Sequence, residues 1–205
     1  MRKARIAVLV SGGGTNLQAL LDAQAAGALK SGEIALVVSD RPGAYALERA
    51  AKAGVPGMEI GKKACGGQAA FEAKLEEALA EQRIDLIVLA GFLSILSPDF
   101  TRRHDHRILN IHPSLIPSFC GAGYYGLKVH EAALARGVKV TGATGHYVNE
   151  IPDGGEIIAQ TAVEILPGDT PEVLQRRVME QAEWILLPKA AEEVSGKLMK
   201  EEKDV

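Results

Sequence analysis

Short apolar runs alternate along the chain with segments whose apolar residues recur at helical spacing. The run Arg5–Val10 (RIAVLV) is rich in β-branched residues, which is typical of a strand buried on both faces. Leu17, Leu20 and Leu21 follow at the spacing of one helix face. Applied along the chain, these patterns predict strands at Arg5–Val10, Glu33–Ser39, Gly57–Ile60, Asp85–Ala90 and Arg107–Ile111, and helices at Asn16–Ala25, Ala44–Ala53, Ala69–Glu81 and Leu127–Arg136.

The pattern changes in the last third of the chain. Lys139–Val148 and Glu156–Ile165 alternate more between apolar and polar residues, which predicts two strands antiparallel to one another. Thr170 then caps a long helix with Pro171 at its first position. Pro188 is expected to kink or divide this helix, and the charged segment Lys197–Val205 is expected to fray.

Repeated strand–helix–strand units predict an α/β fold. We expect a Rossmann-like, doubly wound and mostly parallel sheet with an antiparallel C-terminal hairpin. No internal repeat or break in composition divides the chain, so residues 1–196 are predicted to form a single domain, followed by the tail 197–205. In such sheets ligands bind outside the carboxyl ends of the strands, and candidate chemistry is expected there.

A glycine loop, Ser11-Gly-Gly-Gly-Thr-Asn16, lies between the first predicted strand and helix. Glycines let the backbone approach an anion closely, and the helix N-terminus adds free N–H groups. Leu17 stands where a dinucleotide fingerprint needs its third glycine, and no Gly-Lys-Ser/Thr follows as in a P-loop. A single phosphate suits this short loop best, although a tight turn without a ligand remains the alternative.

Asn110 and His112 lie at the carboxyl end of a predicted strand, on the same side of it. An amide donor beside an imidazole can hold a developing oxyanion and move a proton. Asp153, in the turn Ile151-Pro-Asp-Gly-Gly155, could face the same edge and would favour the protonated imidazole. Each residue also has a structural interpretation, His112 as a residue at a strand end and Asp153 as part of a hairpin turn.

The other histidines carry weaker signals. His146 lies inside a predicted strand and is expected to orient loops or fill the core. His104, His106 and His130 are expected on helix or loop surfaces. No Cys, Asp or Glu cluster accompanies them at ligand spacing, so no metal site is predicted.

Composition excludes several classes of protein. Hydrophobic residues make up 47% and charged residues 24% of the chain, and its net charge is -3, which does not indicate a nucleic-acid partner. No apolar stretch approaches the roughly 18 residues of a membrane span, and the N-terminus does not resemble a signal peptide. Cys65 and Cys120 form no paired motif. The expected location is cytoplasmic, with small-molecule substrates. Many such folds form homodimers, but the sequence identifies no interface.

Taken together and in order, these elements resemble the phosphoribosylglycinamide formyltransferases, a folate-dependent family of purine synthesis. The likeness covers nearly the whole chain. It lies in VLVSGGGTNLQAL (8–20), LAGFLSILSPDF (89–100), LNIHPSLIPSFCGAGYYGLKVHEA (109–132), VTGATGHYVNEIPDGGEIIAQ (140–160) and RVMEQAEWILLPKA (177–190). The Asn-x-His-Pro-Ser element with a later Asp-Gly is specific to folate formyltransferases.

The resemblance implies the formyltransferase fold and the transfer of a formyl group from 10-formyltetrahydrofolate, a co-substrate, to the amine of glycinamide ribonucleotide. It implies that Asn110, protonated His112 and Asp153 are catalytic. By position, it assigns the substrate phosphate and ribonucleotide to Gly14, Thr15, Asn16 and Glu183, and the folate to Gln68, Leu93, Ser94, Ile95, Leu96 and Asn110.

Several positions depart from the family pattern. The segment Arg177–Glu183 is one residue longer than the commonest pattern, which makes Glu180 a rival of Glu183. Near the folate side, the departures are Ser94, Gly145, Asn149 and Gly155-Glu156. Two alternatives stay open: another formyl-folate enzyme of the same superfamily, and a non-catalytic nucleotide-binding module that needs only the glycine loop.

Overall fold

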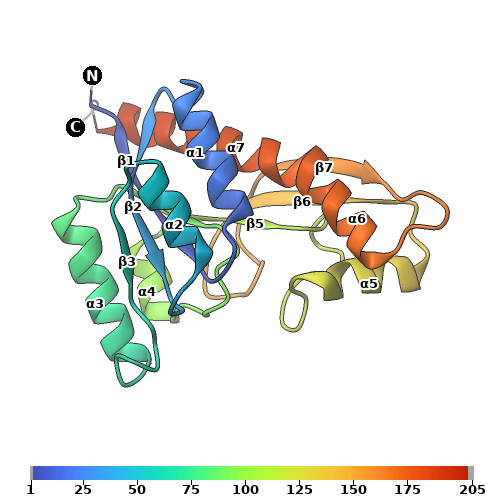
Figure 1. Ribbon diagram of the computed structural model, residues 1–205, viewed down its shortest axis with the longest axis horizontal. Coiled ribbons are helices and arrows are strands. Elements are labelled where there is room, and N and C mark those ends of the chain that lie inside the picture. The colour runs from blue at the N-terminus through green and yellow to red at the C-terminus, as the bar shows by residue number, and fades with distance from the viewer. Residues whose placement is uncertain (1, 203–205) are drawn as a thin grey trace.

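The computed structural model describes residues 2–202, and its centre is one seven-stranded sheet (Figure 1). The strand order is β3-β2-β1-β4-β5-β6-β7. The strands are β1 (Ala4–Val10), β2 (Gly32–Ser39), β3 (Gly57–Glu59), β4 (Leu86–Leu89), β5 (Ile108–His112), β6 (Val140–Tyr147) and β7 (Ile157–Glu164).

The first five strands run parallel, whereas β6 pairs antiparallel with both β5 and β7. Chain order reverses beside β1, so this is a doubly wound sheet in which ligands bind outside the carboxyl ends of the strands. The predicted α/β fold, with its mostly parallel sheet and antiparallel C-terminal hairpin, is confirmed.

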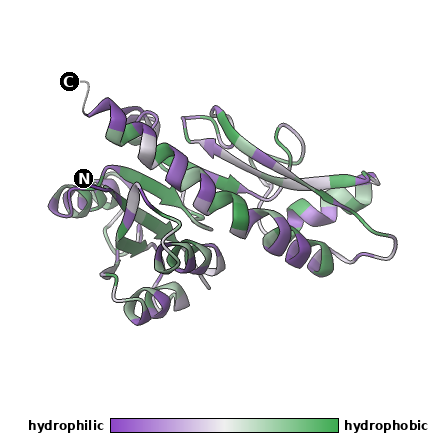
Figure 2. Cartoon of the chain, turned by 90° about the horizontal axis from the view of Figure 1, so that it is seen from above, coloured by the Kyte–Doolittle hydropathy of each residue, from purple (hydrophilic) through white to green (hydrophobic). Residues whose placement is uncertain are grey.

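Helices cover both faces of the sheet and bury separate cores. Leu17 and Leu20 of α1 pack with α2, α6 and α7 on one face, whereas Phe71 of α3 and Phe100 of α4 pack on the other. In Figure 2 the central strands are largely hydrophobic, while hydrophilic residues appear on the surrounding helices. The helices are α1 (Thr15–Ala25), α2 (Tyr45–Lys52), α3 (Gln68–Glu81), α4 (Pro98–Arg103), α5 (Leu127–Arg136), α6 (Pro171–Val178) and α7 (Trp184–Glu201), with a π-helical turn η1 (Met179–Glu183) between α6 and α7.

The C-terminal helix differs from the expectation at Pro188. The break in α-helical geometry falls at η1, before the proline, and Pro188 lies inside α7. Pro188 lacks the N–H that would bond the carbonyl of Trp184, so α7 gives up one backbone hydrogen bond near its start. The helix also continues through residue 196 to Glu201, so residues 197–201 are helical rather than frayed, and 203–205 lie outside the described residues.

Two further expectations change. The short helix α4 was not predicted, although Ser97 caps it and Pro98 opens it, because six residues carry too little periodicity. The surface position expected for His130 is wrong, since its side chain is fully buried. Helix α5 packs against α6, and this contact covers the face that carries Val129, His130 and Ala133.

Candidate active site

The candidate catalytic residues meet where β5 ends. Asn110 and His112 lie two residues apart on this strand, and β6 places His146 directly opposite Asn110. The turn that follows β6 brings Asp153 to the same place, with 3.4 Å between Asp153 Oδ2 and His112 Nδ1. The structure therefore brings Asn110, His112 and Asp153 into one cluster at the edge of the sheet where ligands bind.

The two nitrogens of the buried His112 ring face two different acceptors. Nδ1 faces the Asp153 carboxylate, and Nε2 lies 2.9 Å from the carbonyl oxygen of Phe119. A carbonyl oxygen can only accept, so Nε2 donates to Phe119, and a proton on Nδ1 faces the carboxylate at ion-pair distance without a hydrogen bond to it. The arrangement therefore suits a cationic imidazole that is oriented through Nε2.

Asp153 is both a turn residue and a member of this cluster. The N–H of Gly154 donates to the carbonyl of Ile151 at 2.9 Å, and Pro152 precedes Asp153, whose φ is 55°, as in a type II turn. Glycine or asparagine usually occupies that left-handed position. Here an aspartate does, and its Oδ2 accepts the Gly121 N–H at 2.8 Å. The turn thus aims a carboxylate at the site.

The charge of Asp153 is favoured by its partners. Burial raises the pKa of its carboxyl group, but contacts with His146, His112 and the Gly121 N–H outweigh burial and hold the pKa below its ordinary value. Its contribution to stability is present above the ordinary pKa of 3.8 and is lost as the pH falls through the lowered pKa. Asp153 is therefore ionised at neutral pH.

His146 is the member of this cluster that sequence reasoning did not count as a site residue. Its Nδ1 lies 2.8 Å from the carbonyl of Tyr147, and its Nε2 lies 3.1 Å from Asn110 Nδ2 and 3.6 Å from Asp153 Oδ1. Nδ1 donates to the Tyr147 carbonyl, so Nε2 lies between two members of the cluster, the Asn110 amide and the Asp153 carboxylate. His146 thereby orients an amide rather than a loop. The signal for it is the register of β5 with β6, which is not visible in a single strand.

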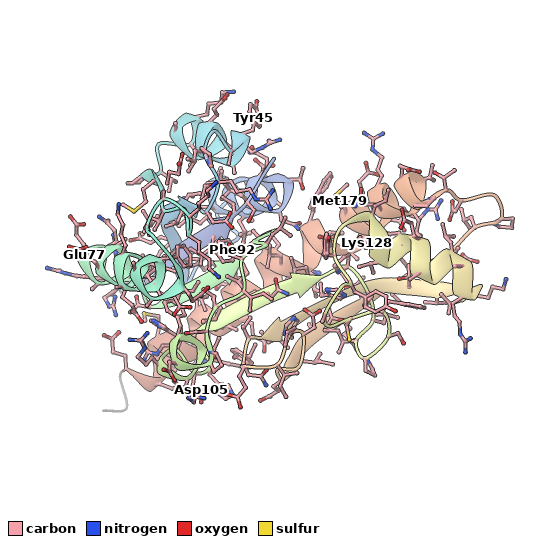
Figure 3. The ribbon with its side chains drawn as sticks, turned by 90° about the horizontal axis from the view of Figure 1, so that it is seen from below. Tyr45, Glu77, Phe92, Asp105, Lys128 and Met179 are labelled. Atoms are coloured by element: carbon pink, nitrogen blue, oxygen red, sulfur yellow. The ribbon has the colours of Figure 1, made fainter. Side chains whose placement is uncertain are left out.

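A cavity of about 120 Å³ opens beside the cluster. Ser94, Ile95 and Leu96 line it together with Asn110, His146 and Asp153. Phe92, which also lines it, lies near the middle of the molecule in Figure 3. The cavity is largely apolar, with amide, imidazole and carboxylate groups at one side, as is typical of small-molecule sites.

Two expected folate residues lie outside this cavity. The side chain of Leu93 is half exposed, and its N–H donates to Ser11 Oγ at 2.8 Å. Gln68 lies on α3, and its Nε2 donates to the carbonyl of Ile95 at 3.1 Å. Leu93 thus belongs to the loop that lines the cavity and Gln68 contacts that loop, but neither side chain lines the cavity.

The glycine loop leads into α1 as expected. Gly14 has φ 71° and immediately precedes the helix, whose first residue, Thr15, is exposed. Asn16 is buried, and its Nδ2 donates to Glu183 Oε2 at 2.8 Å, so its side chain is already engaged. An anion at this loop would therefore meet backbone N–H groups and the Thr15 hydroxyl.

The π-helical turn η1 decides which glutamate faces the loop. A π turn accommodates an extra residue in a helix, which accounts for the additional residue of this segment. Glu183 points inward to Asn16, whereas Glu180 is half exposed and pairs with Arg176 at 3.4 Å. Burial raises the pKa of the Glu183 carboxyl, and the hydrogen bond from Asn16 opposes that effect. Met179, the first residue of η1, is labelled in Figure 3.

Replacement of Gly14 with alanine is expected to destabilise the protein. A Cβ at Gly14 would lie 2.7 Å from Ala46 Cβ, in a left-handed conformation that alanine disfavours. We expect the free energy of unfolding to fall by about 2–4 kcal/mol, as measured by urea denaturation. Gly13→Ala is the matched control, since nothing lies within 4 Å of a Cβ there. Equal losses in the two variants would contradict this account of the loop.

Comparison with known proteins assigns the family. Residues 4–190 match the formyl transferase family. The chain belongs to this family. A phosphoribosylglycinamide formyltransferase of Haemophilus influenzae is 41% identical over 177 residues, which are 86% of this chain and 81% of that protein. The crystal structure of glycinamide ribonucleotide transformylase 1 from Symbiobacterium toebii superposes with a TM-score of 0.88 at 42% identity, covering 95% of this chain and 89% of that one.

Some relatives of this formyl transferase are much longer. The bovine trifunctional purine biosynthetic protein adenosine-3 is 43% identical over 195 residues, which are 95% of this chain but 19% of that protein. The chain thus spans 13% to 19% of the length of the first trifunctional relatives that it matches. Within residues 2–202, no helix is long and apolar enough to cross a membrane, and no group of three His, Cys, Asp or Glu side chains could hold a metal ion.

Two departures of this formyl transferase from the family pattern have structural partners. Ser94 Oγ donates to Asp40 at the end of β2, at 2.5 Å. Asn149 accepts from the Ile151 N–H at 2.9 Å and donates to the Gly154 carbonyl at 3.2 Å, so it bridges the turn that carries Asp153. Both residues therefore support loops around the cavity.

Proposed function

We propose that this protein transfers the formyl group of 10-formyltetrahydrofolate to the amine of glycinamide ribonucleotide, giving formylglycinamide ribonucleotide in purine synthesis. The observation that carries the proposal is the Asn110–His112–Asp153 cluster beside an apolar cavity. The names of the relatives support the choice of substrates.

The proposed binding mode divides the edge of the sheet between two substrates. The folate lies in the cavity lined by Ser94, Ile95 and Leu96, where backbone groups of the loop contact its pterin ring. The phosphate of the ribonucleotide lies at Gly14, Thr15 and the backbone of Asn16. The N–H of Leu93 is bonded to Ser11, so the two binding loops are connected.

The proposed reaction begins when the substrate amine attacks the formyl carbon and forms a new C–N bond. The formyl oxygen becomes an oxyanion, which the Asn110 amide and protonated His112 stabilise. The bond to N10 of the folate then breaks, and N10 takes up a proton that His112 supplies. The attacking amine loses one proton, and Asp153, held against His112, relays protons through water so that the imidazole is reprotonated.

The test is an assay of the wild-type protein with glycinamide ribonucleotide and 10-formyltetrahydrofolate. We expect tetrahydrofolate and formylglycinamide ribonucleotide in equal amounts. Formate release without need of the ribonucleotide would instead identify a formyl-folate hydrolase. Ribonucleotide binding without turnover by well-folded protein would identify a nucleotide-binding module, and either outcome would refute the proposal.

Glu183 is proposed to contact the glycinamide end of the substrate, since it is buried beside the glycine loop and Glu180 faces outward. We expect Glu183→Gln to raise KM for the ribonucleotide about tenfold, because the amide replaces one of the two acceptor oxygens with a donor. Glu180→Gln, the matched control on the same turn, should leave KM within about twofold. The reverse ranking in steady-state kinetics would assign the contact to Glu180.

A further inference from the structure

The loop that lines the cavity is held from outside by a buried glutamate. This loop, Leu93–Ser97, connects β4 to α4 and carries the backbone of the proposed folate site. Glu72 lies on α3 with 6% of its surface exposed, and it does not line the cavity. Its hydrogen-bond partners are Ser97, the last residue of the loop, and Gln68, which contacts Ile95 in the loop.

The carboxylate of Glu72 accepts three hydrogen bonds. The N–H of Ser97 donates to Oε1 at 2.6 Å, and the hydroxyl of Ser97 donates to Oε2 at 2.6 Å. Gln68 Nε2 donates to Oε1 at 2.5 Å and also to the carbonyl of Ile95. One side chain of α3 thus fixes the end of the loop directly and its middle through Gln68.

Ser97 has a second function that depends on this contact. Its Oγ accepts the N–H of Phe100 at 3.2 Å and so caps α4. The hydroxyl proton is given to Glu72, so the oxygen is oriented to accept from the helix. Glu72 therefore sets both the path of the loop and the start of the following helix.

Hydrogen bonds keep this buried carboxyl group charged. Burial raises the pKa of Glu72, but the bonds from Ser97 and Gln68 and the charge of Arg103 outweigh burial, and the pKa lies below its ordinary value. An apolar residue at this position would leave the Ser97 N–H without an acceptor in a buried place, which favours a rearranged loop.

We propose that Glu72 is a positioning residue for the co-substrate: it holds Leu93–Ser97 in the conformation that binds the folate, without touching the folate itself. This inference rests on the proposed function, because it assigns the cavity to a folate. The structure also predicts a selective effect on the folate, since Glu72 fixes the loop at Ser97 and, through Gln68, at Ile95, whereas the bond to the glycine loop is made by Leu93.

The test compares three variants with the wild type. Glu72→Leu keeps the volume and removes all three bonds, whereas Glu72→Gln keeps an oxygen that accepts from Ser97 and Gln68. Glu76→Leu is the matched control, since Glu76 lies one turn further along α3 and contacts His104 and Arg103 instead. Tetrahydrofolate binding is measured by isothermal titration calorimetry, and KM is measured for both substrates.

We expect Glu72→Leu to weaken tetrahydrofolate binding and raise KM for 10-formyltetrahydrofolate about tenfold, with KM for the ribonucleotide within about twofold. Glu72→Gln should recover most of this loss, and Glu76→Leu should match the wild type. Unchanged binding in Glu72→Leu, or an equal rise in both KM values, would overturn the inference.

A variant of Ser97 covers the case in which Glu72→Leu does not fold. Ser97→Ala removes only the hydroxyl contact and should weaken tetrahydrofolate binding about threefold. Unchanged binding in that variant would overturn the inference as well. Wild-type protein that binds no tetrahydrofolate would refute the proposed function, whereas binding that no variant alters would refute the role of Glu72 alone.

Discussion

Replacement of His112 with alanine is expected to lower kcat by about a thousandfold, because the reaction loses its proton donor and one of two groups that stabilise the oxyanion. His112 is buried, and its ring is held between Asp153 and the Phe119 carbonyl. The KM values should change much less than kcat, since the ring acts mainly on the transition state.

The control for this variant is His106→Ala, because His106 is exposed and contacts Asp105, Glu156 and the Tyr147 ring rather than Asp153 or Phe119. Thermal melting checks that both variants are folded. Unchanged kcat in a folded His112→Ala protein would refute the mechanism, while transfer by the wild type would still support the function.

Replacement of Asp153 with asparagine is expected to lower kcat on the order of a hundredfold and to shift the pH profile of activity toward lower pH. Asparagine tolerates the left-handed conformation of this turn position, so the turn itself should persist. A neutral amide then replaces the carboxylate that faces His112 Nδ1 at 3.4 Å, so a positive charge on the ring loses its anionic partner.

A shift of the pH profile has two conceivable causes: titration of Asp153 itself, or titration of a group that its carboxylate affects. The lowered pKa of Asp153 keeps the carboxylate ionised above its ordinary value of 3.8, so its own titration cannot move a profile measured from about pH 5 to 9. A shift in that window must come from a group that the carboxylate affects. If kcat falls equally at every pH and the profile does not shift, Asp153 only holds the turn and does not affect the charge of His112.

The pattern of apolar and polar residues along the chain predicted much of this fold and part of its site. The parallel strands appear as uniform apolar runs because both faces of the sheet are covered. Alternation along β5 placed Asn110 and His112 on one side, because strand geometry depends on neighbouring residues alone. For Asp153, the local pattern allowed both a turn residue and a carboxylate facing His112, and it could not decide between them.

Features that depend on non-local packing were not predictable in this way. His146 belongs to the cluster only because β6 pairs with β5 in one register. The burial of His130 depends on the packing of α5 against α6. The role inferred for Glu72 depends on its contact with Ser97, which lies 25 residues further along the chain. The sequence indicated an extra residue before Glu183. It could not predict the π turn at Met179–Glu183, which depends on how the helix packs.

Phe119 and Gly121 contact the candidate catalytic pair through their peptide groups alone, a carbonyl toward His112 and an N–H toward Asp153. Any amino acid supplies a carbonyl, and any residue but proline supplies an N–H. The constraint on this loop therefore falls on its backbone conformation, with Phe119 at φ 50° and Gly121 at φ 84°. Among formyl transferases, the side chain at Phe119 should therefore vary more than the glycine at Gly121, whereas an inserted or deleted residue between them would displace both peptide groups at once.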